Sequence, residues 1–315
     1  MQQFFFSERY LRLIELNRSG QHAEARVLVN RALAETEGKE RGFWLLVRGA
    51  RPMAFGVYHI PTVMADLNAA LACAPDDPEM QEHVLVNLLA LVVKVERPDL
   101  LEGWLGRIHH ILRQAQEPFR IHANLGMLQS FRGRPGAALR HFNRVIEEMR
   151  VLPPERIAAH RGRFAALHCR RALAALECGQ IEQAERDVQT ASELYAHPQL
   201  PRISHLPLAL ARAGLHLAHH DLQTARQVLQ WVRATETGSN SRRVEVQFQA
   251  EAELMAGRIA LAEGNLLAFE HFARRALDLL ERNQLQISAA RVRAIRRSLL
   301  ERSGAPVSIP GEGSP

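Results

Sequence analysis

The chain has 315 residues and a net charge of +6, and 47% of its residues are apolar, 23% charged and 6% aromatic. This apolar share can form a continuous core, which excludes a chain that is disordered by composition. The three cysteines are odd in number and show no paired spacing, so we expect a reducing compartment and no disulfide framework.

The N-terminal segment lacks the basic region of a secretory signal, and its apolar run is limited to Phe4, Phe5 and Phe6. No apolar run reaches the roughly 20 residues that a membrane span needs. We therefore expect a cytoplasmic protein without a membrane partner.

The basic residues are almost all arginines, since Lys39 and Lys94 are the only lysines. A genome rich in G+C would produce this bias without selection. Alternatively, the arginines are selected for contacts with anions or nucleic acid, because a guanidinium matches a carboxylate or a phosphate. Acidic residues are interspersed among them, a pattern typical of solvated helix faces.

A short sequence pattern recurs along the chain. It consists of a glycine or polar residue, four variable residues, and a small or apolar residue at which an amphipathic segment begins. It begins at Gly20, Gly133, Gly179, His220 and Gly264. Two further turns fit near Tyr58 and Arg97, which gives steps of 38, 39, 36, 46, 41 and 44 residues. Helix-length patterns flank these turns, and no segment has the alternation of a strand. The sequence predicts an all-helical chain of about seven helix hairpins.

The hairpin around Gly133 shows the pattern most clearly. Its predicted helices cover residues 118–132 and 135–150. Gly126 is small where the two helices would cross, which allows a close approach. The second helix carries an apolar stripe with spacings of four and three residues, formed by Ala138, Phe142 and Val145.

Helices are also predicted over residues 180–197, 244–263 and 286–302. We expect the last of these to be a capping helix with a polar outer side. Residues 304–315 are rich in Gly, Pro and Ser and predict a flexible tail, so that the helical domain covers residues 1–303. Gly49 and Pro52 predict an irregularity within a helix-like run, and the array is either continuous or divided into two stacked sub-arrays.

These features resemble the tetratricopeptide-repeat superfamily. The best-matching residues are Leu125, Gly126, Gly133, Ala138, Phe142 and Val145, and the segment from Ala70 to Pro75 resembles the family's repeat ending. The resemblance covers roughly residues 4–283. Two departures are Ile121, which stands where the family has a tryptophan, and later repeats that exceed the usual length of about 34 residues.

The resemblance implies a right-handed superhelical α-solenoid with about seven hairpins and a C-terminal capping helix. The first helices of the hairpins would line a concave face that binds a partner. Long repeats of this kind resemble the helical domains of bacterial signalling proteins and transcriptional activators, which sense peptides, metabolites or partner proteins.

The resemblance also points to groove residues, because some tetratricopeptide domains hold a partner's terminal carboxylate with Asn, Lys and Arg on successive first helices. Asn124 lies two residues before Gly126, and Arg170 lies two residues before the matching small residue of the next repeat. Asn87 and Arg120 are candidates for the same face. The lysine of the family pattern is missing here, and ordinary solvated polar positions remain the alternative.

Other residue clusters predict no catalysis, metal site or cofactor. His216, His219, His220 and Asp221 form the most metal-like group, but histidines near a helix C-terminus are also favoured by the helix dipole. Cys169 and Cys178 have no nearby partner that would make a nucleophile, and no Gly-rich phosphate loop is present. We therefore expect a protein that is not an enzyme.

The expected partner is a protein or peptide, including an acidic one, held by a scaffold, an adaptor or the sensing part of a regulator. The alternative is a sensor of a small ligand or nucleic acid, for which the terminal arginines form an anion patch: Arg291, Arg293, Arg296 and Arg297. No helix-turn-helix signature, zinc finger or aromatic stacking motif supports nucleic acid. Self-association into a homo-oligomer is also left open.

Overall fold

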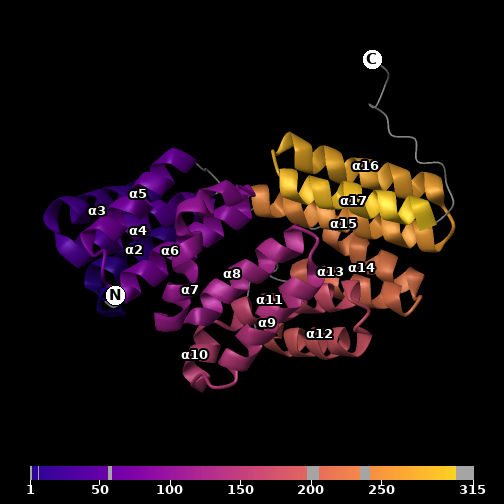
Figure 1. Ribbon diagram of the computed structural model, residues 1–315, viewed down its shortest axis with the longest axis horizontal. Coiled ribbons are helices and arrows are strands. Elements are labelled where there is room, and N and C mark those ends of the chain that lie inside the picture. Colours follow the sequence, from indigo (N-terminus) through magenta and orange to yellow (C-terminus); the bar gives the residue numbers. More distant parts are fainter. Residues whose placement is uncertain (1, 6, 56–58, 197–205, 235–241, 303–315) are drawn as a thin grey trace, which may run out of the picture. The chain divides into compact units, whose positions relative to one another are not determined.

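The computed structural model describes residues 2–5, 7–55, 59–196, 206–234 and 242–302. All regular secondary structure in these ranges is helical (Figure 1). This confirms the prediction of an all-helical chain. No helix in the described ranges combines the length and the apolar character that crossing a membrane requires. The predicted tail, residues 304–315, lies outside them.

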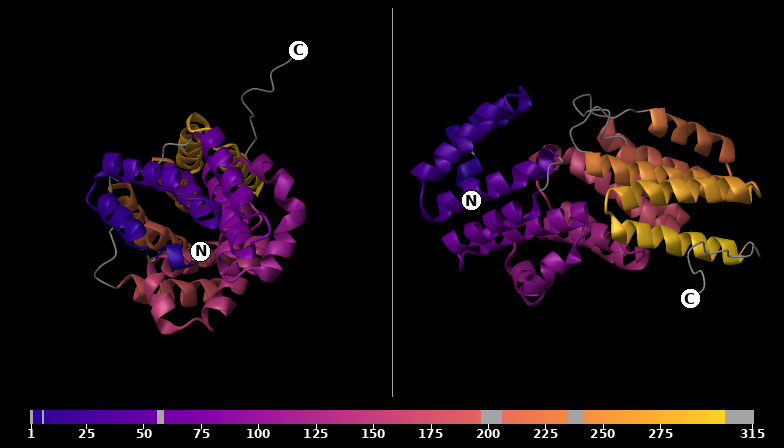
Figure 2. Two further views of the ribbon diagram at one scale, coloured as in Figure 1. Left: turned by 90° about the vertical axis from the view of Figure 1, so that its left-hand side faces the viewer. Right: turned by 90° about the horizontal axis from the view of Figure 1, so that it is seen from above.

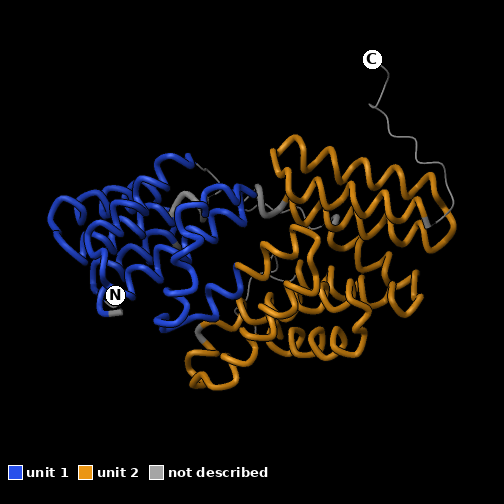
Figure 3. Tube along the Cα trace, viewed as in Figure 1, with its two compact units in different colours: residues 1–124 blue, residues 125–315 orange. Residues whose placement is uncertain are grey.

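The chain divides into two compact units, residues 1–124 and 125–315, which are described separately (Figure 3). Unit 1 contains α1 (Gln2–Phe5), α2 (Glu8–Arg18), α3 (His22–Glu35), α4 (Gly38–Phe55), α5 (Ile60–Cys73), α6 (Pro78–Val95), η1 (Pro98–Trp104) and α7 (Leu105–Gln114). Helix α8 (Pro118–Phe131) begins in unit 1 and ends in unit 2. Unit 2 continues with α9 (Pro135–Met149), α10 (Pro154–Ala159), α11 (Arg161–Glu177), α12 (Ile181–Tyr195), α13 (Leu206–Ala218), α14 (Leu222–Ala234), α15 (Arg242–Ala262), α16 (Leu266–Arg282) and α17 (Gln286–Arg302).

Within each unit the helices pack as neighbouring pairs. In unit 1, α2 packs against α3 and α4 against α5. In unit 2, α11 pairs with α12, α13 with α14 and α15 with α16, while α17 follows against α16 (Figure 2). We call α8, α11, α13 and α15 the first helices of unit 2, because each precedes the turn of its hairpin, and α9, α12, α14 and α16 the second helices.

Five of the predicted turns share one backbone geometry. The residue at the turn has a positive φ of 61° to 77°, and the next backbone N–H donates to the carbonyl five residues earlier, over 2.8–2.9 Å. This is the Schellman ending of a helix, in which a left-handed residue lets the last carbonyls find donors. Glycine adopts that conformation without strain. The residues are Gly20, Gly133, Gly179, His220 and Gly264.

The two weaker predicted turns differ. The turn near Arg97 is present, with Glu96 in the left-handed region at the end of α6. Tyr58 lies outside the described residues. The expected irregularity at Gly49 and Pro52 is wrong, since α4 is continuous over residues 38–55. A Cβ on Gly49 would lie 3.3 Å from the Cβ of Asp66, so this glycine serves the close approach of α4 to α5.

The middle hairpin crosses at its smallest side chains, as predicted. A Cβ added to Gly126 on α8 would lie 2.5 Å from Cε1 of Phe142 on α9, a separation that packed atoms do not reach. Phe142 and Ala138 are fully buried. Gly126 therefore allows the Phe142 ring to lie directly against the α8 backbone.

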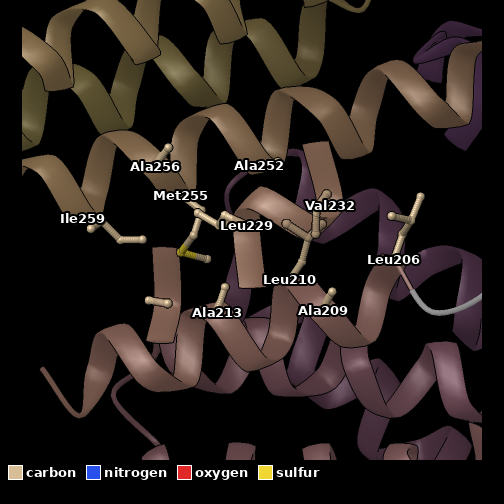
Figure 4. Packing of buried hydrophobic residues seen from close by; sticks show 11 residues of the cluster. Leu206, Ala209, Leu210, Ala213, Leu229, Val232, Ala252, Met255, Ala256 and Ile259 are labelled. Atoms are coloured by element: carbon tan, nitrogen blue, oxygen red, sulfur yellow. The ribbon is translucent and has the colours of Figure 1, made fainter. Parts of the chain in front are cut away.

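A tightly packed apolar core joins α13, α14 and α15 (Figure 4). Small residues of this core alternate with large ones, which brings the helices close together. Leu210 and Met255 also reach a cavity on the first helices, so the core holds the walls of that cavity in place. The labelled residues are Leu206, Ala209, Leu210, Ala213, Leu229, Val232, Ala252, Met255, Ala256 and Ile259.

Candidate functional site

A cavity of about 220 Å³ lies among the first helices of unit 2. Its described walls come from α8, α11, α13, α15 and α17, and no second helix contributes to them. We call it the arginine cavity, after Arg170, Arg258 and Arg291. Glu177 and Glu251 also line it, and the rest of its lining is Ser130, Leu173, Ala174, Leu176, Leu210, Gly214, Leu217, Ala218, Leu254 and Met255.

The charged residues of α11 and α15 lie in matching positions. Each helix has wall residues three, four and seven positions after its first charged one, which is one face of a helix, and α11 adds Leu176 beside this face. Arg170 begins the face of α11 and Glu177 ends it, whereas Glu251 begins the face of α15 and Arg258 ends it. Two ion pairs result: Arg170 Nη1 lies 2.9 Å from Glu251 Oε1, and Arg258 Nη2 lies 3.7 Å from Glu177 Oε1. Since both pairs join residues 81 apart, the two helices run in the same direction and in register.

Arg170 is held on three sides. Its Nη1 donates to both carboxylate oxygens of Glu251, over 2.9 and 3.1 Å. Its guanidinium carbon lies 4.9 Å from the ring centroid of Phe248 and 5.9 Å from that of Phe131. Stacking on aromatic faces favours the charged guanidinium and restricts its rotation. The side chain is 10% exposed, so this cation is both buried and preorganised.

The other end of the cavity places one carboxylate between two guanidiniums. Glu177 accepts a hydrogen bond from Nη2 of Arg291 and faces Arg258. Burial lowers the pKa of Arg258 from its usual value, and the positive charge of Arg291 lowers it further while Glu177 opposes the change. The Nε of Arg291 is buried and makes no hydrogen bond to the described residues. This end of the cavity therefore has an excess of donors and of positive charge.

The composition of the walls determines which ligands the cavity favours. Three arginines face two carboxylates, and each guanidinium carries five N–H donors. The volume lies below the roughly 300 Å³ at which sites for whole small molecules begin. The arrangement suits one anionic group, such as a carboxylate, with a short aliphatic stem against the leucines.

The predicted groove residues fall in both units. Arg170 lines the arginine cavity of unit 2, whereas Asn87, Arg120 and Asn124 belong to unit 1. The amide of Asn87 donates to the carbonyl of His83, and that of Asn124 donates to the carbonyl of Arg120, one turn earlier in each helix. In the described structure, these two amides therefore form hydrogen bonds with the backbone of their own helices.

Arg120 takes part in a buried polar cluster of unit 1. Its Nη1 lies 3.1 Å from Glu117 Oε2, and burial lowers the pKa of Arg120. Glu82 on α6 accepts hydrogen bonds from the backbone N–H groups of Gln116 and Glu117, over 2.8 and 3.0 Å, at the start of α8. These contacts give the cluster a structural role, since they satisfy free N–H groups at a helix N-terminus.

The predicted anion patch on α17 is divided by its ion pairs. Arg291 turns into the arginine cavity. Arg293 pairs with Glu281, and Arg296 forms hydrogen bonds of 2.7–3.0 Å with both oxygens of Glu270. Arg297 is exposed. The four guanidiniums therefore face different surroundings.

The histidine cluster contributes to a turn. His220 is the left-handed turn residue after α13, His216 Nδ1 lies 3.2 Å from Asp221 Oδ2, and His219 Nε2 lies 2.9 Å from Glu185 Oε1. Among the described residues, no group of three or more His, Cys, Asp or Glu side chains is placed to hold a metal ion. The cysteine sequence pattern favours two buried, small apolar side chains, which is confirmed for Cys169 and wrong for Cys178, because Cys178 is exposed after the end of α11.

Three residues of the arginine cavity were missed by the sequence reasoning: Glu177, Glu251 and Arg258. The sequence did contain a signal for them. Each of these charged residues stands at one end of a row of apolar residues on one side of its helix. Applying the spacing of Arg170 and its neighbours to α15 identifies Glu251 and Arg258. Comparison with models of known protein families finds no match to the chain, and comparison with curated proteins finds none either.

Proposed function

We propose that unit 2 is a non-enzymatic recognition module, built from stacked tetratricopeptide-like hairpins, that binds an acidic group of a protein or peptide in the arginine cavity. The observation that carries this proposal is the convergence of Arg170, Arg258 and Arg291 from three different helices on one cavity. Such a module would serve as an adaptor or as the sensing part of a regulator.

The register of α11 and α15 supports the stacked-hairpin part of the proposal. Helices that occupy equivalent places in the hairpins of such a stack run in the same direction. The pairs Arg170–Glu251 and Glu177–Arg258 show this for α11 and α15, the first helices of two hairpins separated by the α13–α14 hairpin. The small residues at helix crossings, such as Gly126, agree with the same architecture.

The chemistry of the cavity supports binding without catalysis. Its described lining holds no histidine, cysteine or aspartate, and its single hydroxyl is that of Ser130. Both glutamates are engaged by arginines. A nucleophile with an adjacent base, which covalent catalysis requires, is therefore missing from these walls.

A titration with a fluorescein-labelled tetraglutamate peptide tests the proposal. Fluorescence anisotropy at low salt would compare the wild type with Arg258→Gln. This substitution keeps the Glu177–Arg291 hydrogen bond and so spares the fold. Arg293→Gln is the matched control, because Arg293 lies on α17, pairs with Glu281 and does not line the cavity.

We expect Arg258→Gln to weaken binding about tenfold, since a charge-assisted hydrogen bond contributes roughly 1.5–3 kcal/mol. Arg293→Gln should retain the wild-type affinity, and added salt should weaken binding of all three proteins. Equal affinities of the two variants, or no binding by the wild type, would show that the cavity does not recognise acidic groups.

A further inference from the structure

A second concave surface in unit 2 runs along α17. This groove has a volume of about 930 Å³, and α17 supplies its longest wall. The opposite wall is the turn between α8 and α9, where Gly133 lies against the side chain of Arg291. We call it the α17 groove, lined by Arg132, Gly133, Arg134, Pro135, Glu177, Arg258, Gln286, Ile287, Ala290, Arg291, Ala294, Ile295, Ser298 and Leu299.

Helix α17 has two apolar faces. One is buried against its neighbours through Ala289, Val292 and Leu300. The other presents small and aliphatic residues to the groove, with Ala290 and Ala294 exposed and Ile287, Ile295 and Leu299 half-buried. Ile295 and Leu299 lie at the edge of this face, since they also pack against the buried side. The exposed Arg293 and Arg297 lie outside the groove and agree with the expected polar outer side of a capping helix, whereas the groove face is largely apolar. An apolar helix face left in a groove is typical of a surface that a partner covers.

The α17 groove and the arginine cavity share Glu177, Arg258 and Arg291 in their walls. Arg132 and Arg134 add to the charge of the groove, which has four arginines and one glutamate. The unused Nε donor of Arg291 belongs to a residue common to both sites. The groove thus combines aliphatic contact area with a positive centre, so a complementary ligand would carry apolar side chains around an acidic one.

The spacing of the groove residues specifies the ligand further. Ile287, Arg291, Ile295 and Leu299 follow one another at steps of four residues, or about 6 Å along a helix. Alternate side chains of an extended peptide lie about 6.6 Å apart on one side of the chain. An extended segment can therefore place successive alternate side chains opposite these four positions.

We propose that the α17 groove binds an extended acidic peptide segment with the alternating pattern aliphatic, acidic, aliphatic, aliphatic, whose acidic side chain enters the arginine cavity. This inference rests on the proposed function, because the acidic side chain occupies the site described there. The aliphatic side chains would lie against Ile287, Ile295 and Leu299.

A protein segment suits these walls better than nucleic acid. Single-stranded nucleic acid is usually held by aromatic side chains on which the bases stack. No described residue that lines the groove is aromatic. Five of its lining residues are alanine, isoleucine or leucine on α17 alone, which favours aliphatic side chains as the ligand.

The test uses the labelled heptapeptide Leu-Ser-Glu-Ser-Leu-Ser-Leu and the same residues in reverse order, so that both chain directions are covered. A peptide with serine in place of each leucine and tetraglutamate are the comparison probes. The groove variant is Ala290→Gln with Ala294→Gln, which adds neutral bulk to an exposed helix face. Its matched control is Ala158→Gln with Ala262→Gln, at two exposed helical alanines of unit 2 outside both sites.

We expect one of the two heptapeptides to bind the wild type about tenfold more tightly than the serine peptide, because the leucines bury apolar surface. The groove variant should lose this advantage, while its affinity for tetraglutamate and the affinities of the control should stay unchanged.

Two results would overturn the groove assignment and leave the proposed function standing. In the first, tetraglutamate binding depends on Arg258, but neither heptapeptide binds more tightly than the serine peptide. In the second, a heptapeptide binds more tightly than the serine peptide to the groove variant as well. No binding of any acidic peptide would overturn both. Displacement of the heptapeptide by a short random-sequence RNA from the wild type, but not from the groove variant, would assign the groove to nucleic acid instead.

Discussion

Arg291 on α17 donates a hydrogen bond to Glu177 on α11, which lies 114 residues earlier in the chain. The same carboxylate also faces Arg258, at 3.7 Å. Glu177 thus lies between two guanidiniums from different helices, α15 and α17, and partly neutralises them. Because an incoming carboxylate would make the same kind of contact, the proposed acidic ligand would compete with Glu177 for these donors.

The first prediction concerns the close crossing of α8 and α9. Gly126→Ala would place a methyl group 2.5 Å from the ring of Phe142, and we expect a loss of about 1–3 kcal/mol in the free energy of unfolding from overpacking. Gly136→Ala is the matched control on α9, where an added Cβ meets nothing within 4 Å. Urea unfolding should show the control to be as stable as the wild type or slightly more so, by up to about 1 kcal/mol. Equal stability of the two variants would contradict the described crossing.

The second prediction concerns the turn after α13, which has histidine in the left-handed position where four of the predicted turns have glycine. His220 is exposed and has a φ of 61° where the four equivalent turns have glycine. His220→Gly should raise the free energy of unfolding by about 1 kcal/mol, because a left-handed conformation strains a residue with a Cβ. Gly179→Ala, in open space at φ 73°, should lower it by a similar amount. Thermal unfolding would measure both, and shifts of the same sign would argue against this explanation.

The third prediction concerns the buried carboxylate of Asp187. Burial raises its pKa, but hydrogen bonds from His168 (2.7 Å) and Arg171 (2.6 and 2.8 Å) lower it by more, so the pKa lies below the usual value. A lowered pKa in the folded state stabilises the fold above the unfolded pKa of about 3.9, and this stabilisation is lost as the pH falls through the folded pKa. Asp187→Asn should therefore lose about 3–5 kcal/mol at pH 7, and its difference from the wild type should shrink in acid.

Urea unfolding of Asp187→Asn at pH 7 and at successively lower pH measures this dependence. Asp278→Asn is the control, since Asp278 is exposed and 3.9 Å from its arginine partner. Its stability should follow the wild type at every pH. A deficit of Asp187→Asn that stays constant down to pH 3 would be incompatible with a lowered pKa.

The fourth prediction concerns two cysteines, Cys169 within α11 and Cys178 directly after it. Burial raises the pKa of Cys169 to about 12, and since the thiolate is the reactive form, this thiol should resist alkylation in the folded protein. Cys178 is exposed and should react with iodoacetamide at pH 8. Mass spectrometry of peptides after timed alkylation would give both rates, and urea should make Cys169 reactive. Comparable rates for the two cysteines in the folded protein would mean that α11 is not packed as described.

Local features of the fold could be predicted from the sequence where one residue type is physically required. Gly133 and Gly179 mark left-handed turns, and Gly126 marks a close crossing, because only glycine meets these demands without strain. The turn before α17 was missed for the same reason, since Gln284 occupies its left-handed position at φ 59°. That α4 continues through Gly49 was also not foreseen, because there the glycine provides contact with α5.

The candidate site was predictable only in part. Arg170 was identified from its place before a small residue, but its partner Glu251 lies 81 residues away, and only the parallel register of α11 and α15 brings them together. The orientation of Arg291 follows from which face of α17 packs against α16. Such pairings depend on packing between helices, and a single helix pattern does not contain that information.

We propose that the arginine cavity binds acidic groups in competition with Glu177. The most direct test of this proposal is an anisotropy titration of labelled tetraglutamate against the wild type, Glu177→Gln and the control Glu281→Gln, whose carboxylate pairs with Arg293 outside the cavity. Removing the competing charge should make Glu177→Gln bind about tenfold more tightly than the wild type, with the control unchanged. Unchanged or weaker binding by Glu177→Gln, or tighter binding by the control alone, would show that acidic groups do not bind at the donors that Glu177 occupies.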